Sequence, residues 1–126
     1  MVSWNSKKQP IVALSSTEAE YRGAALAACE ILWLMKLLAD LGIEVCHPIK
    51  LFCDNMSSVQ LAHNLVYHAR TKHIEVHYHF IRETVLMRWT DLIHVNIEDQ
   101  IADIFTKSLG RDMFTSFREL GDMLPT

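Results

Sequence analysis

The stretch ALSSTEAEYRGAALAACEILWLMKLLADLG, residues 13–42, predicts one long helix. Small hydroxyl residues open it, Gly42 follows it as a natural helix C-cap, and apolar residues cover nearly the whole circumference between them. A helix that is apolar nearly all round is buried on most sides. We therefore expect a central helix that other elements surround.

Two glutamates stand at the start of this helix. Ser15-x-x-Glu18 and Thr17-x-x-Glu20 both match a capping box, but a helix has one N-cap, so the two cannot both form. If Ser15 caps, Glu18 belongs to the first turn, and Glu20 lies one turn deeper and faces a neighbouring element rather than solvent. The pattern by itself leaves helix capping and a chemical role open for both.

Three apolar runs have the length of strands, and helical patterns separate them. We expect strands at residues 11–14 (IVAL), at Ile49–Cys53 and at residues 92–95, and further helices at residues 55–64, around 74–85, at 98–109 and in an amphipathic piece through 124. Strands that alternate with helices indicate an α/β architecture. The length of 126 residues suits a single domain over residues 1–126.

The composition excludes several classes of protein. With 50% hydrophobic residues and a formal charge of −3, the chain resembles neither a disordered segment nor a strongly basic, nonspecific nucleic-acid binder. Charges interrupt every apolar run before it reaches the roughly 20 residues that span a bilayer, so no membrane association is expected. The three cysteines form no C-x-x-C pair and no signal-peptide pattern opens the chain, which predicts free, mostly buried thiols and an intracellular place, cytoplasmic or nuclear.

Two aspartates complete a candidate acidic site. Asp54 follows a predicted strand directly, where it can be a helix N-cap or a ligand at the carboxyl end of the strand. Asp103 lies four residues before Lys107, the spacing of an ordinary surface ion pair. If Glu20, Asp54 and Asp103 converged, two carboxylates about 4 Å apart would repel by about 4 kcal/mol. Mg²⁺, or Mn²⁺, would reverse the sign of that interaction and bring two-metal phosphodiester hydrolysis into reach.

Four segments, SWNSKKQPIVALSSTEAEY, LFCDNMSSVQLA, RTKHIEVHYHFIRE and EDQIADIFTK, resemble in this order the ribonuclease H domain of copia-type retrotransposon polyproteins. The resemblance implies an RNase H-like fold, a mixed sheet with flanking helices, that hydrolyses the RNA strand of an RNA·DNA hybrid. It implies that Glu20, Asp54 and Asp103 are catalytic and hold Mg²⁺, while Glu18 is a capping residue. The expected partners are the hybrid and the reverse transcriptase portion of the polyprotein.

Basic side chains near the third motif are candidates for phosphate contacts. Arg70, Lys72 and Arg82 could add sequence-independent affinity, and Asn55 beside Asp54 is assigned to the same nucleic-acid contacts. For the three basic residues, an ordinary solvated role is an equally good interpretation.

Two histidine and cysteine clusters are weaker candidates for a metal. His73 and His77 are one helical turn apart without an evident third ligand, so a structural or hybrid-facing role is favoured. Cys46, His47 and Cys53 fit no familiar zinc spacing.

One departure from the resembled family changes the expected activity. The family's site has a fourth carboxylate, an aspartate on a first strand that lies centrally in the sheet, and the first two strands are absent from this sequence. We therefore expect a partial domain, weakly active or inactive alone, with exposed strand edges that could pair with another copy. The alternative is a noncatalytic remnant that acts as a nucleic-acid-binding or protein-interaction module.

Overall fold

The computed structural model describes residues 4–64 and 72–123, and the side chains of residues 4–64 and 76–122. The elements follow the order α1 (Ser16–Asp40), β1 (Ile49–Cys53), α2 (Met56–His63), α3 (Lys72–Leu86), β2 (Thr90–His94), the 3-10 helices η1 (Ile97–Asp99) and η2 (Ile101–Phe105), and α4 (Arg111–Met123). The predicted α/β class is confirmed.

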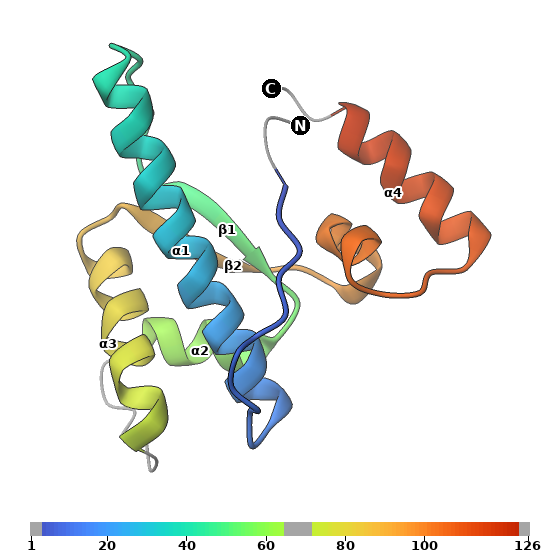
Figure 1. Ribbon diagram of the computed structural model, residues 1–126, viewed down its shortest axis with the longest axis horizontal. Helices are drawn as coiled ribbons and strands as arrows, with labels where there is room; N and C mark the ends of the chain where they lie inside the picture. The colour runs from blue at the N-terminus through green and yellow to red at the C-terminus, as the bar shows by residue number, and fades with distance from the viewer. Residues whose placement is uncertain (1–3, 65–71, 124–126) are drawn as a thin grey trace.

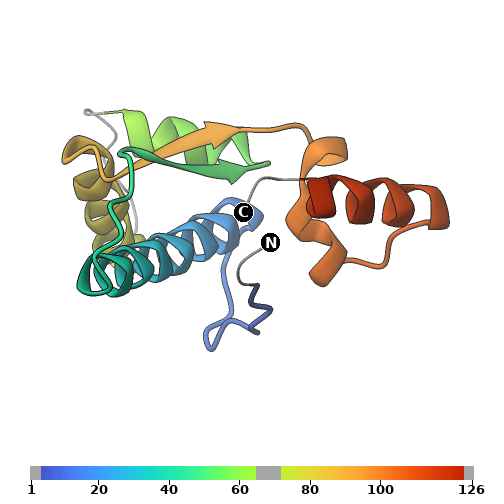
Figure 2. The same ribbon diagram turned by 90° about the horizontal axis from the view of Figure 1, so that it is seen from above.

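The two strands form a small parallel sheet. Ile49 pairs with Thr90 and Cys53 with His94, and the Val95 amide extends the ladder by donating to the Cys53 carbonyl at 3.0 Å. Parallel neighbours need a long crossover, which α2 and α3 supply. Figure 2 shows α1 running along one side of the strands, with α3 near their amino ends and η2 and α4 beyond their carboxyl ends.

Helix α1 begins as a capping box predicts. Ser15 has an extended backbone, and its side chain accepts a hydrogen bond from the Glu18 amide at 3.1 Å. After Leu41 the chain turns at Gly42, whose φ of 76° lies in the left-handed region that favours glycine. Both ends of this helix were therefore predictable from sequence.

The core is built on the small face of α1. Ala24, Ala25 and Ala28 are buried, which lets α1 approach β1 and α3 closely (Figure 1). Tyr21 is fully buried beside them, stacks on Tyr78 of α3 at 6.1 Å between ring centroids, and donates its hydroxyl to the Tyr78 carbonyl at 3.2 Å. This contact fixes the rotation of α1 about its axis.

The predicted strand at residues 11–14 is wrong. These residues are irregular, and Val12 and Leu14 are 90% and 81% exposed. A strand needs a neighbour that accepts its backbone hydrogen bonds, and among the described residues β1 pairs with β2 alone. The Leu14 amide donates to the Glu18 carboxylate at 2.9 Å instead. The expected mixed sheet is likewise not seen, since both described strands run in the same direction.

Burial of α1 on most sides is also not observed. All of its buried residues lie between Glu18 and Ala28, whereas Leu26, Trp33 and Leu37 are exposed by 49%, 58% and 40%. A sheet of two strands is too narrow to cover a helix of 25 residues. No residue of the second half of the helix is therefore buried, and several of its apolar residues are exposed.

The predicted helix at residues 98–109 is replaced by two short 3-10 helices. Gln100 breaks the run with ψ of 89°, and its side-chain amide donates to the Phe52 carbonyl at 3.4 Å. The last amphipathic helix is confirmed as α4, whose Phe117 is buried and which packs on η2, as Figure 1 shows at the right. Position 124 lies outside the described residues.

All three cysteines are free, but Cys29 and Cys46 are exposed and only Cys53 is buried, so the expectation of mostly buried thiols is wrong. Among the described residues, no helix combines the length and the apolar character that a bilayer crossing requires.

The tight approach of α1 makes a testable prediction about stability. Ala28→Leu would force a larger side chain into a fully buried position and should destabilise the fold by about 1–3 kcal/mol. The matched control is Ala39→Leu on the same helix, because Ala39 is exposed and Leu suits a helix nearly as well as Ala. Urea unfolding of the two variants measures the difference. Equal stabilities would contradict the proposed packing.

Candidate functional site: an acidic cluster at the end of the sheet

Asp54 does not cap helix α2, although its position after a strand and before a helix allowed that role. The N-cap of α2 is Asn55, whose side chain accepts from the Ser58 amide at 2.9 Å. Asp54 therefore keeps its carboxylate for other contacts, although its side chain is only 12% exposed. It lies directly after the carboxyl end of β1, where open α/β sheets place ligands.

Glu20 of α1 reaches the same place. Its carboxylate, the Cys53 sulfur and the Asp54 carboxylate offer ligand atoms that all lie within 4.8 Å of one another. Burial and, next, the negative charge of Asp54 raise the pKa of Glu20 above its ordinary value. Contrary to expectation, the residue as a whole is exposed rather than packed against a neighbouring element.

Glu18 has the structural role that was predicted for it. It is buried, forms an ion pair with Arg22 at 2.7 Å one turn along α1, and accepts from the Leu14 amide. The glutamate that supports the start of the helix is thus distinct from the glutamate that joins the acidic cluster.

Asp103 lies on η2, a separate element from those that carry Glu20 and Asp54. Its side chain is 8% exposed and accepts from the Lys107 ammonium at 2.9 Å. The ion pair that the i, i+4 spacing indicated is therefore present, but its carboxylate is buried rather than at the surface. The 3-10 turn also explains the pairing, since its last amides, Thr106 and Lys107, both donate to the Asp103 carbonyl and fold residue 107 back over the turn.

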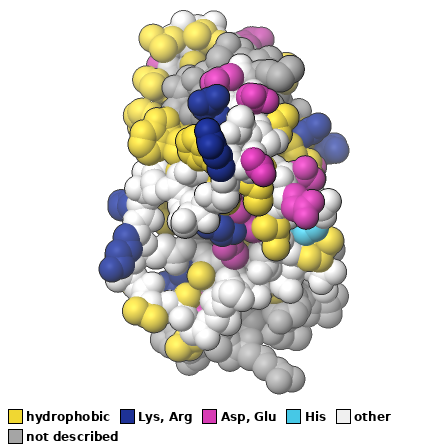
Figure 3. Space-filling model, turned by 90° about the vertical axis from the view of Figure 1, so that its right-hand side faces the viewer, with side chains coloured by type: hydrophobic (Ala, Val, Ile, Leu, Met, Phe, Trp, Pro, Cys, Tyr) yellow, Lys and Arg dark blue, Asp and Glu magenta, His cyan; other side chains and the backbone are white. Residues whose placement is uncertain are grey.

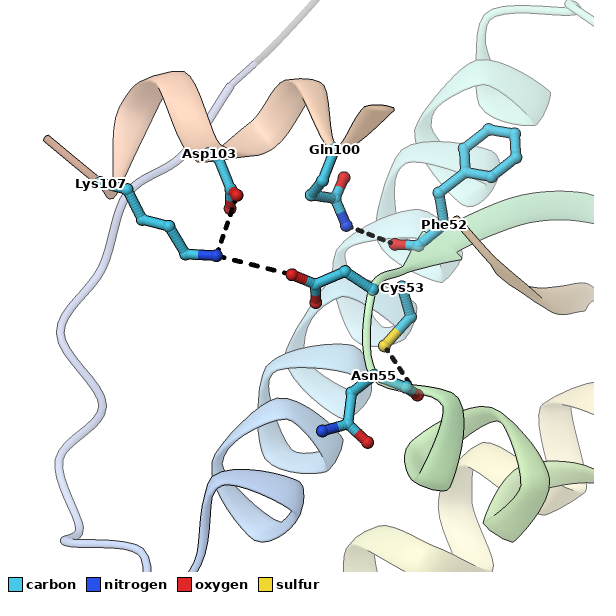
Figure 4. A network of polar contacts seen from close by, with 7 residues as sticks. Phe52, Cys53, Asn55, Gln100, Asp103 and Lys107 are labelled. Atoms are coloured by element: carbon cyan, nitrogen blue, oxygen red, sulfur yellow. Dashed lines mark hydrogen bonds and ion pairs between the residues drawn. The ribbon is translucent and has the colours of Figure 1, made fainter. Parts of the chain in front are cut away.

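Lys107 joins the two aspartates. Its ammonium lies 3.5 Å from an Asp54 oxygen as well as 2.9 Å from Asp103, as the dashed lines in Figure 4 show. The hydrogen bond to Asp103 is the main cause that raises the pKa of Lys107. The positive charge of Lys107 also lowers the pKa of the third acid, Glu20, and so partly offsets the effect of the negative charge of Asp54. The cluster is therefore three acids around one ammonium group.

The donor set suits a hard divalent cation. Glu20 and Asp54 supply carboxylate oxygens within reach of one ion, and Asp103 is linked to Asp54 through a single shared cation. Carboxylate oxygens are the ligands that Mg²⁺ and Mn²⁺ prefer. The residues present therefore fit the predicted metal. Glu20 and Asp54 lie close enough to share an ion, whereas Asp103 is not part of that close group.

Sequence reasoning missed two members of the cluster. Cys53 was taken for a strand residue, and Lys107 for half of a surface pair. The alternation of the strand could have indicated Cys53, because residues 51 and 53 share one face, but only the fold brings Glu20 to that face. Burial raises the pKa of the Cys53 thiol, which lies 3.8 Å from the Asn55 carbonyl.

The predicted nucleic-acid contacts are only partly described. Arg70 and the side chain of Lys72 lie outside the described residues. Arg82 is on α3, where its guanidinium donates to the Tyr78 hydroxyl at 3.3 Å and lies 5.8 Å from the ring centroid. Asn55 caps α2 next to Asp54. Acidic and basic side chains of the described residues intermix on the face shown in Figure 3, so the described residues form no continuous basic tract on this face.

The weaker metal candidates gain nothing from the structure. Within the described residues, Glu20, Cys53 and Asp54 are the group of potential ligands that converges, and Cys46 is exposed outside it. His73 has no described side chain, and His77 is half-buried on α3.

The chain is similar in sequence to three Pol polyproteins of plant transposons. It is 46% identical over 121 residues to the "Retrovirus-related Pol polyprotein from transposon RE2" of Arabidopsis thaliana, a match that covers 95% of this chain. The RE1 protein of the same plant is 46% identical over 92% of the chain, and the TNT 1-94 protein of Nicotiana tabacum 41% over 97%. This chain is related to transposon Pol polyproteins.

The relationship concerns a small part of those polyproteins. The chain spans only 8%, 8% and 9% of the three relatives, so the activities of the complete polyproteins do not pass to it directly. No protein-family model matches the chain, and no solved structure does. The Pol relationship therefore establishes a polyprotein-derived domain.

The raised pKa of Glu20 predicts a pH-dependent effect of its removal. A carboxyl whose pKa is higher in the folded than in the unfolded state favours folding when protonated, and this contribution is lost as pH rises through the folded-state pKa. Metal-free Glu20→Gln should therefore be more stable than the unmodified chain at pH 7, and the difference should vanish below about pH 4. Thermal unfolding in EDTA across this range measures it. A destabilised variant at pH 7 would contradict the repulsion.

Proposed function

We propose that this chain is the ribonuclease H segment of a retrotransposon Pol polyprotein and contributes to cleavage of the RNA strand of an RNA·DNA hybrid. The observation that carries the proposal is the convergence of Glu20 and Asp54 within 4.8 Å, with Asp103 linked to Asp54 by Lys107. Three segments far apart in the chain supply these acids. Folding stability alone does not favour such a cluster, because like charges repel.

Relatives and chemistry support the same conclusion from different directions. The relatives are Pol polyproteins of transposons, and the motifs containing the three acids resemble the ribonuclease H domain of the copia type. Hydrolysis of a phosphodiester needs a group that neutralises charge on the phosphate and activates water. Mg²⁺ bound by carboxylates supplies both.

The chain's own residues would have separable duties. Glu20 and Asp54 would hold the metal from two elements that the core fixes rigidly, and Asp103 would complete the set from η2. Asn55 places the first turn of α2 beside the acids, so the backbone there can contact a nucleic-acid phosphate. The scissile phosphate would approach from the exposed side of Glu20.

A preceding part of the polyprotein would complete the sheet. The outer edge of β1 has no partner among the described residues, and the apolar residues Ile11, Val12 and Leu14 lie exposed in an irregular segment. We propose that two strands from upstream, with a fourth carboxylate, pair with these edges and that the reverse transcriptase portion is the natural neighbour. Without them, a second copy of this chain can occupy the same edges. Reverse transcription would place the protein inside the cell, in the cytoplasm or nucleus.

A cleavage assay tests the proposed activity. The chain alone should cut an RNA·DNA hybrid with Mg²⁺ weakly or not at all, and a polypeptide extended by the preceding polyprotein segment should cut it readily. In the extended protein, Asp54→Asn should lower the rate at least about 100-fold because a metal ligand is lost.

The matched control in that assay is Asp99→Asn, which removes an exposed aspartate of η1 and should leave the rate unchanged. An extended protein that folds but leaves the hybrid intact would count against the nuclease. Hybrid binding without cleavage would favour the noncatalytic module.

Hybrid binding tests the basic residues separately. Arg70→Ala and Lys72→Ala should each weaken binding for all sequences and reduce the slope of log K against log salt by about 0.9 if the residue contacts a phosphate. Lys36→Ala on α1 is the charge-matched control. Unchanged slopes in both variants would assign Arg70 and Lys72 to an ordinary solvated surface.

A further inference from the structure

Lys107 has an unusual position for a surface lysine. Its side chain is 48% exposed, yet its ammonium contacts two carboxylates that are 8% and 12% exposed and come from different parts of the fold. One contact is local, four residues back on η2, and the other reaches Asp54 at the end of β1. Figure 4 shows the ammonium between these two groups.

This ammonium group helps to hold the two parts of the molecule together. Residues 97–123 pack mainly on one another, and the described polar contacts across to the sheet are the Gln100 amide to the Phe52 carbonyl at 3.4 Å and Lys107 to Asp54. The amino-terminal segment adds Trp4 stacked on Phe105 at 5.0 Å and the Ser6 hydroxyl on the Phe105 carbonyl. The ion pair is the contact among these that bears directly on the acidic cluster.

The ammonium group of Lys107 and a divalent cation bound at Asp54 would compete for the negative charge of the same carboxylates. An ammonium group between two carboxylates satisfies them with one positive charge, whereas a divalent ion brings two and repels the ammonium. The half-exposed lysine can move into water at small cost, since its stem is flexible and its charge is well solvated there. The buried aspartates cannot move away in this manner.

We propose that Lys107 is a built-in counter-ion, which holds Asp54 and Asp103 together before the metal binds and gives up this position when it arrives. Lys107 then sets the metal concentration at which the site fills. The inference rests on the proposed function, because both involve the same carboxylates. It predicts which cation contacts these carboxylates, the ammonium group or the metal, and not whether the hybrid is cleaved.

Removing the charge while keeping most of the stem separates these effects. Lys107→Met should bind Mn²⁺ about fivefold more tightly than the unmodified chain, about 1 kcal/mol, because no ammonium has to be displaced. In EDTA the same variant should melt at a lower temperature, and saturating Mn²⁺ should restore much of the loss. Mn²⁺ binding to the full chain is measured by electron paramagnetic resonance, with Mg²⁺ as competitor.

Two further variants control the result. Lys36→Met removes a lysine sixteen residues from Glu20 on α1, about 24 Å along the helix axis, and should leave Mn²⁺ affinity unchanged. Lys107→Arg keeps the charge and should bind Mn²⁺ no more tightly than the unmodified chain, so it answers the question even if Lys107→Met folds poorly. An arginine variant that binds fivefold more tightly would overturn the inference.

The outcomes distinguish this inference from the nuclease. Tighter Mn²⁺ binding by Lys107→Met, with no cleavage by the extended protein, supports the counter-ion and contradicts the nuclease. Cleavage by the extended protein, with equal or weaker Mn²⁺ binding by a folded Lys107→Met, leaves the nuclease standing and overturns the counter-ion. Absence of Mn²⁺ binding in every variant, including the unmodified chain, overturns the counter-ion, and the cleavage assay on the extended protein then decides the nuclease separately.

Discussion

The close packing of one helical face, built from Tyr21 and three alanines, on β1 and α3 is the constraint on which the rest of the structure depends. Alanine side chains let the helix approach the sheet, and the Tyr21 hydroxyl on the Tyr78 carbonyl prevents rotation of the helix. Glu20 directly precedes Tyr21, so this rotation decides where its carboxylate lies. Helix packing, rather than any contact of the carboxylate itself, brings Glu20 to the end of β1.

Charge repulsion at that place explains much of the local structure. Three acids lie near one another, and the ammonium group of Lys107 offsets part of their repulsion. Lys107 follows the short 3-10 helix η2, which carries Asp103. Burial and neighbouring aspartates raise the pKa of Glu20, because both disfavour the ionised form of its carboxylate. An arrangement that costs stability and is held by packing elsewhere is typical of a functional site.

The exposed apolar surfaces have a common cause. The sheet is only two strands wide, so no residue of α1 after Ala28 is buried, and Ile11, Val12 and Leu14 are exposed, although the composition of both segments is that of buried elements. Binary patterning predicted burial for both and could not indicate what covers them. A chain that spans about a twelfth of its Pol relatives leaves room for neighbours to do so.

The sequence by itself determined the α/β class, both ends of α1, the strand Ile49–Cys53 and α2, because capping and periodicity are local signals. Motif resemblance, a linear signal, predicted Glu20, Asp54 and Asp103 as the site, and their catalytic role stays a prediction. The tertiary structure decided that Asn55 rather than Asp54 caps α2, that residues 11–14 form no strand, that residues 98–109 are not one helix, and that Cys53 and Lys107 join the acids. Strand pairing and ion pairs between distant segments depend on which partners the fold brings within hydrogen-bonding distance, and that proximity is not encoded in the spacing of any one segment.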